Sequence, residues 1–191
     1  KAGLSLVHCG IESGNEYMRN TVMLREQTLQ SIYKAANLLK KYQVKLLTEN
    51  VLGNPGETIE MAMETLKLNM EIKPEISNAS IFAPYPGLQM TQYAIKGGYF
   101  DGNFDKLEST YWDSSVLKFK KKSDERKIYN LRCFFSLLTQ HPSLIWVIRP
   151  LLYLPFRKLF WSIGNILDGY YTRKGMAYKL KPKEFIISAI H

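Results

Sequence analysis

Cysteine is scarce in this sequence. Of its 191 residues only two are cysteine, Cys9 and Cys133, and they lie far apart in the chain. Two distant cysteines form neither a disulfide scaffold nor, by themselves, a multi-cysteine metal site. Such sparing use of cysteine is typical of proteins in a reducing compartment, so we expect a cytoplasmic protein.

Acidic residues are scarce toward the C-terminus. Residues 1–140 contain 18 Lys and Arg and 15 Asp and Glu, a net charge of +3, whereas residues 141–191 contain 8 and 2, a net charge of +6. This basic end favours an anionic partner, such as lipid head groups or a phosphorylated substrate. Nucleic acid is not expected, because the cations are interleaved with bulky aliphatic side chains and no nucleic-acid-binding motif is present.

No uninterrupted run of apolar residues is long enough to cross a membrane. Residues 144–163 come closest, but a spanning helix needs about 20 apolar residues with few charges. Five residues interrupt the run: Arg149, Pro150, Pro155, Arg157 and Lys158. We expect the two prolines to divide the segment into short helices. Two alternatives remain for it, namely packing on the rest of the protein through Trp146 and Trp161, or peripheral attachment of residues 141–191 to an anionic membrane surface.

The overall composition is that of an ordinary globular protein. Hydrophobic residues make up 46% and charged residues 23% of the chain, which excludes a disordered or collagen-like protein. The sequence starts with Lys1-Ala2 and enters an apolar run at once, without an initiating Met or a signal peptide. We therefore expect the chain to be a piece of a larger protein.

Three units repeat the order strand, glycine-containing turn, helix. Predicted strands cover 4–10, 44–52 and 78–83, and predicted helices cover 15–24, 28–41, 58–72 and 89–96. Such repeats are typical of α/β proteins in which right-handed crossovers join parallel strands. We predict an incomplete half of a (β/α) TIM-type barrel with parallel strands, followed by a helical C-terminal region. The predicted division is 1–98 for the half-barrel, 99–122 for an irregular linker and 123–191 for the basic helical region.

Polar residues stand at the end of each predicted strand, where parallel sheets bind their ligands. The strand ends carry Glu12 and Ser13, then Glu49 and Asn50 with Gly53, then Tyr85 preceded by Pro84. Because side chains alternate along a strand, only one of Glu49 and Asn50 can face the interior of a barrel. Glu12 has a purely structural alternative, which is an ion pair with Arg19 or Arg25 at the start of the next helix.

Three motifs follow one another in a fixed order. They are GIESG at 10–14, NVLGNPGET at 50–58 and FAPYPG at 82–87, with Arg25 between the first two. The ordered set resembles the second half of the core of radical S-adenosylmethionine (SAM) enzymes. It is most similar to the class that carries an N-terminal cobalamin-binding domain. The resemblance covers about residues 2–98.

The first motif and the residues after it imply contacts with the polar parts of SAM. Glu12, followed by Ser13, matches an acidic or amide residue that contacts the ribose or the methionine part, and a carboxylate accepts two hydrogen bonds from a ribose diol. Arg25 matches an arginine that holds the SAM carboxylate, with Arg19 as the alternative.

The two later motifs imply the remaining contacts. Glu49 or Asn50 matches a polar residue near the ribose, and Val51 matches an apolar residue that packs on adenine. Residues 82–85, which include Ala83 and Tyr85, would form a wall beside the adenine. Glu57 matches a structural position that ties its turn to the following helix.

The sequence departs from the family in one large respect. Radical SAM chemistry requires a CxxxCxxC loop whose thiolates hold a [4Fe–4S] cluster, and no such spacing occurs here. The resemblance therefore implies that the cluster ligands, and any cobalamin-binding domain, lie upstream of Lys1. We expect this chain alone to be inactive, to contain no metal ligands and to form half of the SAM pocket. His8, on the same strand face as Glu12, is interpreted as a satisfied core residue.

Taken with the resemblance, these residues predict a fragment of a radical SAM enzyme, with cobalamin as a further cofactor. The complete enzyme would cleave SAM reductively to a 5′-deoxyadenosyl radical for methyl transfer or rearrangement on a small-molecule or lipid-linked substrate, and no catalytic residue is assigned. One alternative is a non-catalytic, membrane-peripheral or partner-binding domain that retains half of a barrel. Another is a different TIM-barrel enzyme that shares the strand-end glycines by chance.

Overall fold

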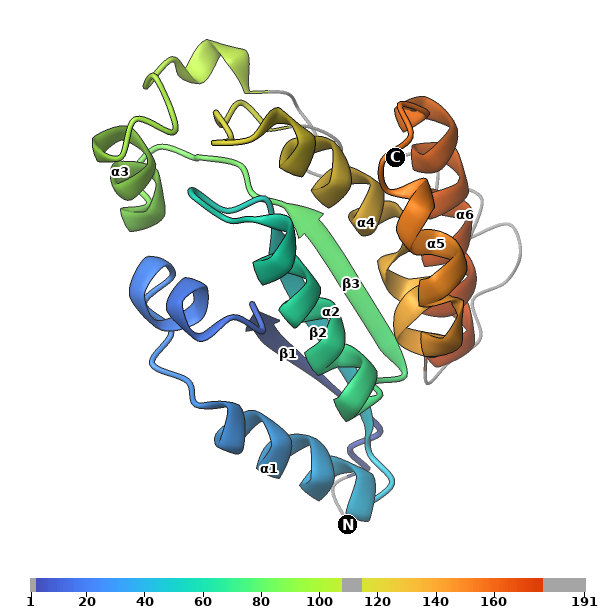
Figure 1. Ribbon diagram of the computed structural model, residues 1–191. Coiled ribbons are helices and arrows are strands. Elements are labelled where there is room, and N and C mark those ends of the chain that lie inside the picture. Colours follow the sequence, from blue (N-terminus) through green and yellow to red (C-terminus); the bar gives the residue numbers. More distant parts are fainter. Residues whose placement is uncertain (1–2, 108–114, 177–191) are drawn as a thin grey trace.

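The computed structural model describes residues 3–107 and 115–176, and its centre is a three-stranded parallel sheet. The strands are β1 (Leu6–Glu12), β2 (Lys45–Leu52) and β3 (Ile76–Ile81), and they are adjacent in the order β1-β2-β3. Helices follow each strand and continue after the third (Figure 1). The prediction of a mixed α/β fold with parallel strands and a helical C-terminal region is confirmed.

The helices divide into those that join the strands and those that follow them. The first group is the π-helix η1 (Tyr17–Val22), α1 (Leu29–Lys41), α2 (Ile59–Ile72) and α3 (Gln89–Lys96). The second group is the short 3-10 helix η2 (Phe104–Lys106), α4 (Lys122–Gln140), the 3-10 helix η3 (Pro142–Leu144), α5 (Ile145–Leu151) and α6 (Arg157–Gly175).

The sequence sets the ends of α1 and α2 locally. Thr28 and Thr58 have extended backbones, and their hydroxyls accept hydrogen bonds from the N–H groups of Ser31 and Met61. Each threonine thus satisfies one of the donors that the first turn of a helix leaves free. Lys73 ends α2 in the left-handed conformation, with a φ of 50°, just before Pro74.

Three predicted elements differ from the observed ones by more than one residue. The third strand, predicted at 78–83, begins and ends two residues earlier, at Ile76–Ile81. The first strand lies two residues later than predicted, because a β-bulge between Gly10 and Glu12 continues its pairing with β2 through Glu12. The predicted helix over 15–24 is a π-helix of six residues, Tyr17–Val22. Its backbone ends at Met23, whose N–H donates to the carbonyl of Met18 five residues earlier.

The two faces of the sheet have different surroundings. On β2, Thr48, Asn50 and Leu52 are buried against the helices, whereas Glu49 and Val51 on the opposite face remain half exposed. We call this opposite face, which also carries Asn78 and Ser80 of β3 in register, the inner face. Alternation along parallel strands therefore separates a buried helix-side core from a partly open surface.

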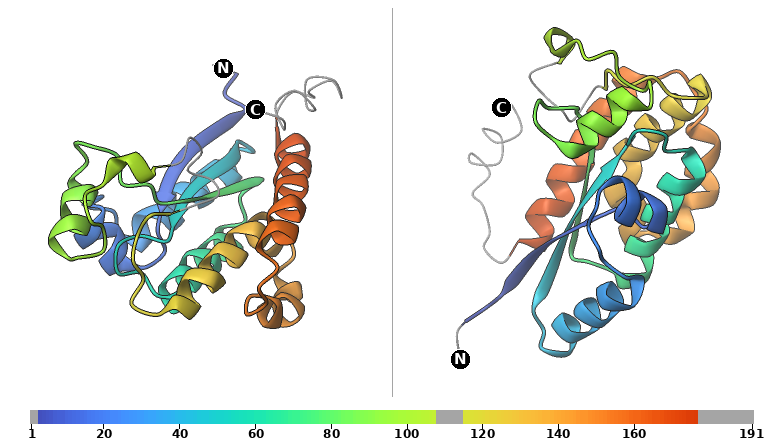
Figure 2. Two further views of the ribbon diagram at one scale, coloured as in Figure 1. Left: turned by 90° about the horizontal axis from the view of Figure 1, so that it is seen from above. Right: turned by 90° about the vertical axis from the view of Figure 1, so that its left-hand side faces the viewer.

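The C-terminal helices pack onto the sheet through the main core. α4 lies beside α2 and β3, and α6 packs along α4 (Figures 1 and 2). One cluster contains residues from both halves of the sequence: Leu52, Leu66 and Ile81 with Ile128, Leu131, Phe135 and Leu138. The α6 end reaches the inner face, where Lys45 Nζ donates to the carbonyl of Gly175 over 2.8 Å.

The C-terminal segment is divided into helices, but the prediction that they are short holds only for α5 with its 7 residues, because α6 has 19. Pro150 is inside α5, which continues one residue further to Leu151. Pro155 lies in the turn before α6. In residues 3–107 and 115–176, no helix is both long and apolar enough to span a bilayer.

Candidate functional site

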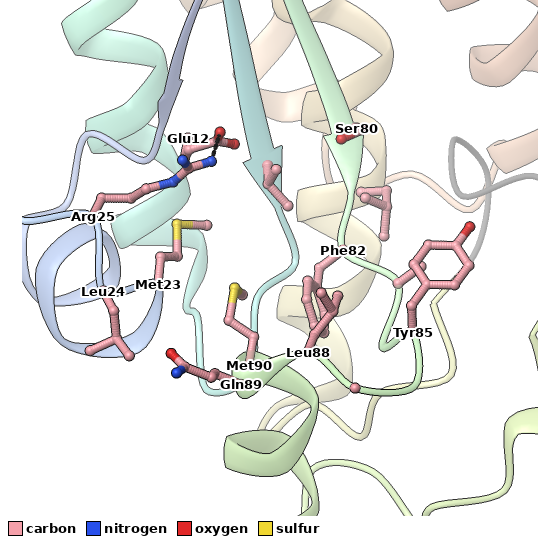
Figure 3. Close-up of a pocket in the computed structure, with 14 residues that line it drawn as sticks. Glu12, Met23, Leu24, Arg25, Ser80, Phe82, Tyr85, Leu88, Gln89 and Met90 are labelled. Carbon is pink, nitrogen blue, oxygen red and sulfur yellow. Dashed lines mark hydrogen bonds and ion pairs between the residues drawn. The ribbon is translucent and has the colours of Figure 1, made fainter.

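A pocket of about 620 Å³ opens at the carboxyl ends of the three strands. This volume lies within the usual range for small-molecule sites. Five of the eight predicted site residues line the pocket: Glu12, Arg25, Val51, Ala83 and Tyr85 (Figure 3). Ser13, Glu49 and Asn50 do not line it.

Glu12 occupies a strained position at the end of β1. It follows the β-bulge and has a φ of 66°, in the left-handed region that a glutamate rarely adopts. Gly10 makes room for its side chain, because a Cβ atom there would lie 2.5 Å from Glu12 Oε1. The bulge and the glycine together turn the Glu12 carboxylate back over the strand. Backbone strain of this kind is concentrated at functional sites in proteins.

Arg25 binds Glu12 on one side of the pocket. Its Nη2 atom donates to Glu12 Oε1 in an ion pair (Figure 3). The two residues that flank Arg25, Leu24 and Glu26, both have left-handed backbones, with φ values of 54° and 51°. The Arg25 side chain is 47% exposed and that of Glu12 only 13%. The guanidinium is therefore accessible to a ligand while it remains paired.

Burial makes the Glu12 carboxylate costly to ionise. Loss of solvent raises the pKa of Glu12 above its ordinary value, the nearby Glu49 raises it further, and Arg25 only partly opposes these effects. A ligand that donates hydrogen bonds, or that carries a positive charge, would stabilise the ionised carboxylate. The site is thus suited to a hydroxyl or ammonium group beside Glu12 and an anionic group beside Arg25.

Glu49 lies on the inner face, next to the pocket, in a row that crosses all three strands. Asn78 Nδ2 donates to Glu49 Oε1 over 2.8 Å, and His8 Nε2 donates to the same oxygen over 3.0 Å. The interpretation of His8 as a core residue is wrong, because its side chain is 60% exposed. The inner face of β1 is open at this level, which no feature of the sequence indicated.

Asn50 and Ser13 point to the helix side instead. The Asn50 side chain is buried, donates to the carbonyl of Asn78 over 2.8 Å and accepts from Asn69 Nδ2 over 2.8 Å. Ser13 is also buried, beside the Thr65 hydroxyl of α2. Alternation left two choices for the polar residue near the ribose, and the structure leaves Glu49 as the one on the inner face.

Arg19, the alternative to Arg25, has a different role. It is buried, and its guanidinium donates to three backbone carbonyls, those of Ser13, Gly14 and Gln27, over 2.8–3.2 Å. These bonds hold the loop around η1 in place. Arg19 does not line the pocket, so Arg25 is the arginine that lies there.

The end of β3 and the start of α3 form the apolar side of the pocket. Phe82 is buried, whereas Tyr85 is exposed at the rim. Two methionines that the sequence did not single out, Met23 and Met90, lie between the Glu12–Arg25 pair and Phe82 (Figure 3). Both lie just outside the recognisable motifs, which is why pattern alone missed them. Flexible thioether side chains adapt readily to a ligand surface.

Glu57 has the structural role that was expected. Its carboxylate is buried and accepts from the backbone N–H of Asn54 over 2.9 Å and from the Asn54 side chain over 3.2 Å. Burial raises the pKa of Glu57 to about 7, and the bonds from Asn54 and Gly53 only partly counter this effect. Glu57 therefore closes the turn between β2 and α2 and does not reach the pocket.

The described residues do not fit an iron–sulfur cluster. Within 3–107 and 115–176, no three His, Cys, Asp or Glu side chains are grouped so that they could hold a metal ion. Cys9 lies in β1 and Cys133 is buried in α4. Cluster ligation would need cysteines other than these two.

Comparison with known proteins gives one informative match. No family model matches the chain. Over 95 residues, half of its length, the chain is 30% identical to a protein of Pyrococcus horikoshii that is described as "Uncharacterized methyltransferase PH0819". The chain spans only about a fifth of the length of that protein. The similarity thus relates half of this chain to a methyltransferase-like protein.

Proposed function

We propose that this chain forms part of the SAM-binding site of a radical SAM enzyme, most similar to the cobalamin-dependent class. The observation that carries the proposal is the Glu12–Arg25 pair, held by strained backbone at the edge of a pocket that the ends of three parallel strands form. The ordered motifs support the same assignment, and the similarity to a methyltransferase-like protein supports its coarser part, SAM-dependent methyl transfer.

The residues of the pocket complement the separate parts of SAM. Arg25 uses one Nη2 bond for Glu12, and its other donors are suited to the planar carboxylate of the methionine part. Glu12 accepts from the ribose hydroxyls or the ammonium group, with Glu49 nearby on the inner face. Val51, Ala83 and Tyr85 form a surface for the adenine ring.

The chemistry that we propose for the complete enzyme exceeds what this chain supplies. Reductive cleavage of SAM needs a [4Fe–4S] cluster, and the described residues do not provide its ligands. The role proposed for this chain is to bind and orient SAM, for methyl transfer or rearrangement on a small-molecule or lipid-linked substrate. A cobalamin site, like the cluster, would be supplied by other parts of the protein.

Equilibrium dialysis of the complete protein that contains this chain, against labelled SAM and labelled 5′-methylthioadenosine, tests the proposal. The second ligand keeps the adenine and ribose but lacks the amino and carboxylate groups. Arg25→Ala should weaken SAM binding by about 1–3 kcal/mol, or roughly 5- to 150-fold, and leave 5′-methylthioadenosine within about two-fold. Glu12→Gln should weaken both ligands, because it alters the contact with the ribose.

Lys34→Ala, an exposed cation on α1, is the matched control and should change neither affinity. Equal loss of both ligands in Arg25→Ala would contradict the assignment of Arg25 to the carboxylate. If the complete protein, of whose SAM pocket this chain supplies half, bound neither ligand at millimolar concentration, the proposal would fail in favour of a non-catalytic domain.

A further inference from the structure

Large apolar side chains are exposed where α5 joins α6. Trp146 and Val147 on α5 are 79% and 62% exposed, Tyr153 and Phe156 in the turn are 58% and 51% exposed, and Leu159 on α6 is 57% exposed. We call these five residues the α5–α6 surface. It lies on the side of the molecule away from α1 (Figure 1).

The α5–α6 surface is continuous along the chain. Trp146, Pro150 and Tyr153 are four and three residues apart, so they follow one side of α5 into the turn. From Tyr153 to Leu159 every residue except Leu154 is exposed. The exposed apolar side chains of this surface are therefore confined to α5, the turn after it and the first residues of α6, which follow one another directly.

Within residues 3–107 and 115–176, the main core is formed without these side chains. Ile148, Leu152 and Phe160, which point the other way, are buried in the main core. The turn is also fixed, because Asn130 Nδ2 donates to the carbonyls of Leu152 and Leu154 over 2.9 Å each. The packing of these buried residues and the bonds from Asn130 thus fix the backbone that exposes the α5–α6 surface.

Within the chain segment that carries this surface the charge has one sign, whereas Glu60 and Glu64 of α2 lie beside Ile145 at the start of α5. Residues 126–167 contain six Lys or Arg and no Asp or Glu. Arg149 and Lys158 are exposed beside the aromatic residues. The next acid along the chain, Asp168, accepts from the Ser136 hydroxyl and faces Arg132. An exposed apolar patch flanked by cations matches a surface that is apolar below and anionic at its boundary.

We propose that the α5–α6 surface docks this protein onto an anionic membrane. Trp146 and Tyr153 would enter the head-group region, where aromatic side chains with a polar edge are favoured, and Phe156 would add apolar area below them. Arg149 and Lys158 would contact the lipid phosphates. The interaction is independent of SAM binding, since none of these residues lines the strand-end pocket.

Co-sedimentation with lipid vesicles tests the proposal. The chain should sediment with vesicles of phosphatidylcholine and phosphatidylglycerol at low salt, should remain soluble with pure phosphatidylcholine, and should dissociate at about 0.5 M salt, where surface charges are screened. The double variants Arg149→Gln/Lys158→Gln and Trp146→Ser/Phe156→Ser should each reduce the bound fraction by about five-fold or more. These four residues are exposed, so the fold should persist, as circular dichroism would show.

Two matched variants on the opposite side control for general charge and hydrophobicity. Lys40→Gln/Lys41→Gln and Leu38→Ser/Tyr42→Ser remove exposed residues of the same kinds from α1 and its end, and should leave binding within about two-fold. Insertion is measured separately by quenching of tryptophan fluorescence with brominated lipid. Trp146→Phe should sediment like the wild type but lose most of the quenching.

Three results would overturn the proposal. The first is no sedimentation with anionic vesicles at low salt, and the second is equal loss of binding in the α1 variants. The third is a dimer in analytical ultracentrifugation that Trp146→Ser/Phe156→Ser abolishes, without vesicle binding by the wild type, which would make this surface an interface between two copies of the chain.

Discussion

Two arginines six residues apart, Arg19 and Arg25, show how far the candidate site could be predicted from residue types. The sequence offered both as the partner of a carboxylate, because either can reach Glu12 from the following helix. The structure separates them by burial: Arg19 is enclosed among backbone carbonyls, and Arg25 is half exposed in the pocket. Burial depends on the path of the chain around η1, and a π-helix has no recognisable pattern in one sequence.

The alternation of side chains along a strand predicted the orientation of Glu49 and Asn50 more fully. It predicted that only one of the two faces the open side, and Glu49 does so while Asn50 is buried against α2. It could not say which side of the sheet would be covered, since that depends on where the helices pack. His8 was wrongly interpreted for the same reason, because it lies on the side of the sheet that the helices do not cover.

The distinction between the arginines predicts losses of stability of different size. Arg19→Ala removes three hydrogen bonds from a charged donor and leaves the carbonyls of Ser13, Gly14 and Gln27 without their partner. We expect the free energy of unfolding to fall by about 3 kcal/mol or more. Arg25→Ala should cost about 1 kcal/mol or less, because its ion pair is partly exposed. Urea denaturation measures both, and an equal loss in the two variants would contradict the assigned roles.

Glu57 makes stability depend on pH in a defined window. Its pKa is about 7 in the folded protein against an ordinary value of 4.5, so between these values the folded state binds more protons than the unfolded state. The contribution of Glu57 to stability is therefore fully present below about pH 4.5 and is lost as the pH rises through 7. The total loss is about 3 kcal/mol, at 1.36 kcal/mol for each pKa unit.

Glu57→Gln should remove this part of the pH dependence, because an amide mimics the protonated acid. Relative to the wild type, the variant should gain about 3 kcal/mol between pH 4.5 and pH 8 in urea denaturation at successive pH values. The difference between the two curves of unfolding free energy against pH removes the contributions of all titratable groups that wild type and variant share. Parallel curves for wild type and variant over this range would show that the Glu57 pKa is not raised.

At the level of helices and strands, local chemistry predicted most of the ends. The helices predicted at 28–41 and 58–72 begin one residue later than predicted, after the caps Thr28 and Thr58, and α3 has the predicted limits, Gln89–Lys96. The predicted ends are wrong where a contact between residues far apart in the sequence determines where an element ends. The bulge at Glu12 extends β1 because β2 pairs with it there, and the turn after Leu151 is held by Asn130 of α4. Neither contact can be predicted from the residues that are nearby in the sequence.

The packing of α6 on α4 depends on one glycine. A Cβ atom at Gly164 would lie 2.9 Å from both the Cα and the carbonyl oxygen of Cys133, and backbone atoms cannot move aside as a side chain does. Gly164→Ala should therefore lower the free energy of unfolding by about 1–3 kcal/mol through overpacking. In an exposed helix the same change would be stabilising by up to about 1 kcal/mol.

The sign of the effect makes this prediction easy to test by thermal and urea denaturation. Ser162→Ala, at an exposed position in the same helix, is the control and should stay within about 0.5 kcal/mol of the wild type. An increase in stability for Gly164→Ala would mean that α6 does not approach α4 this closely.

For the whole molecule, the repeating strand–turn–helix units predicted three adjacent parallel strands, and this arrangement is confirmed. The position of the C-terminal helices could not be predicted in the same way. Their apolar residues indicate burial but not the surface that covers them, and α4 buries side chains on several sides. The division at residues 98 and 122 follows sequence patterns and remains a proposal, and residues 108–114 and 177–191 lie outside the described residues.

The shared core predicts that residues 1–98 cannot fold alone. Leu52, Leu66 and Ile81 pack against α4, and Arg132 Nε and Gln140 Nε2 of that helix donate to the carbonyls of Ala79 and Pro74. Without α4 the helix-side core would face water, and fewer than 100 residues would have to stabilise three strands with one layer of helices.

In urea, the 1–98 fragment should show no cooperative transition, whereas the 191-residue chain should. Adding residues 115–176 as a separate peptide should restore part of the signal, since the two pieces bury a common core. The 1–98 fragment alone could instead unfold cooperatively at the urea concentration that marks the midpoint for the whole chain. That result would show that residues 1–98 form an independent domain whose stability does not depend on the C-terminal helices.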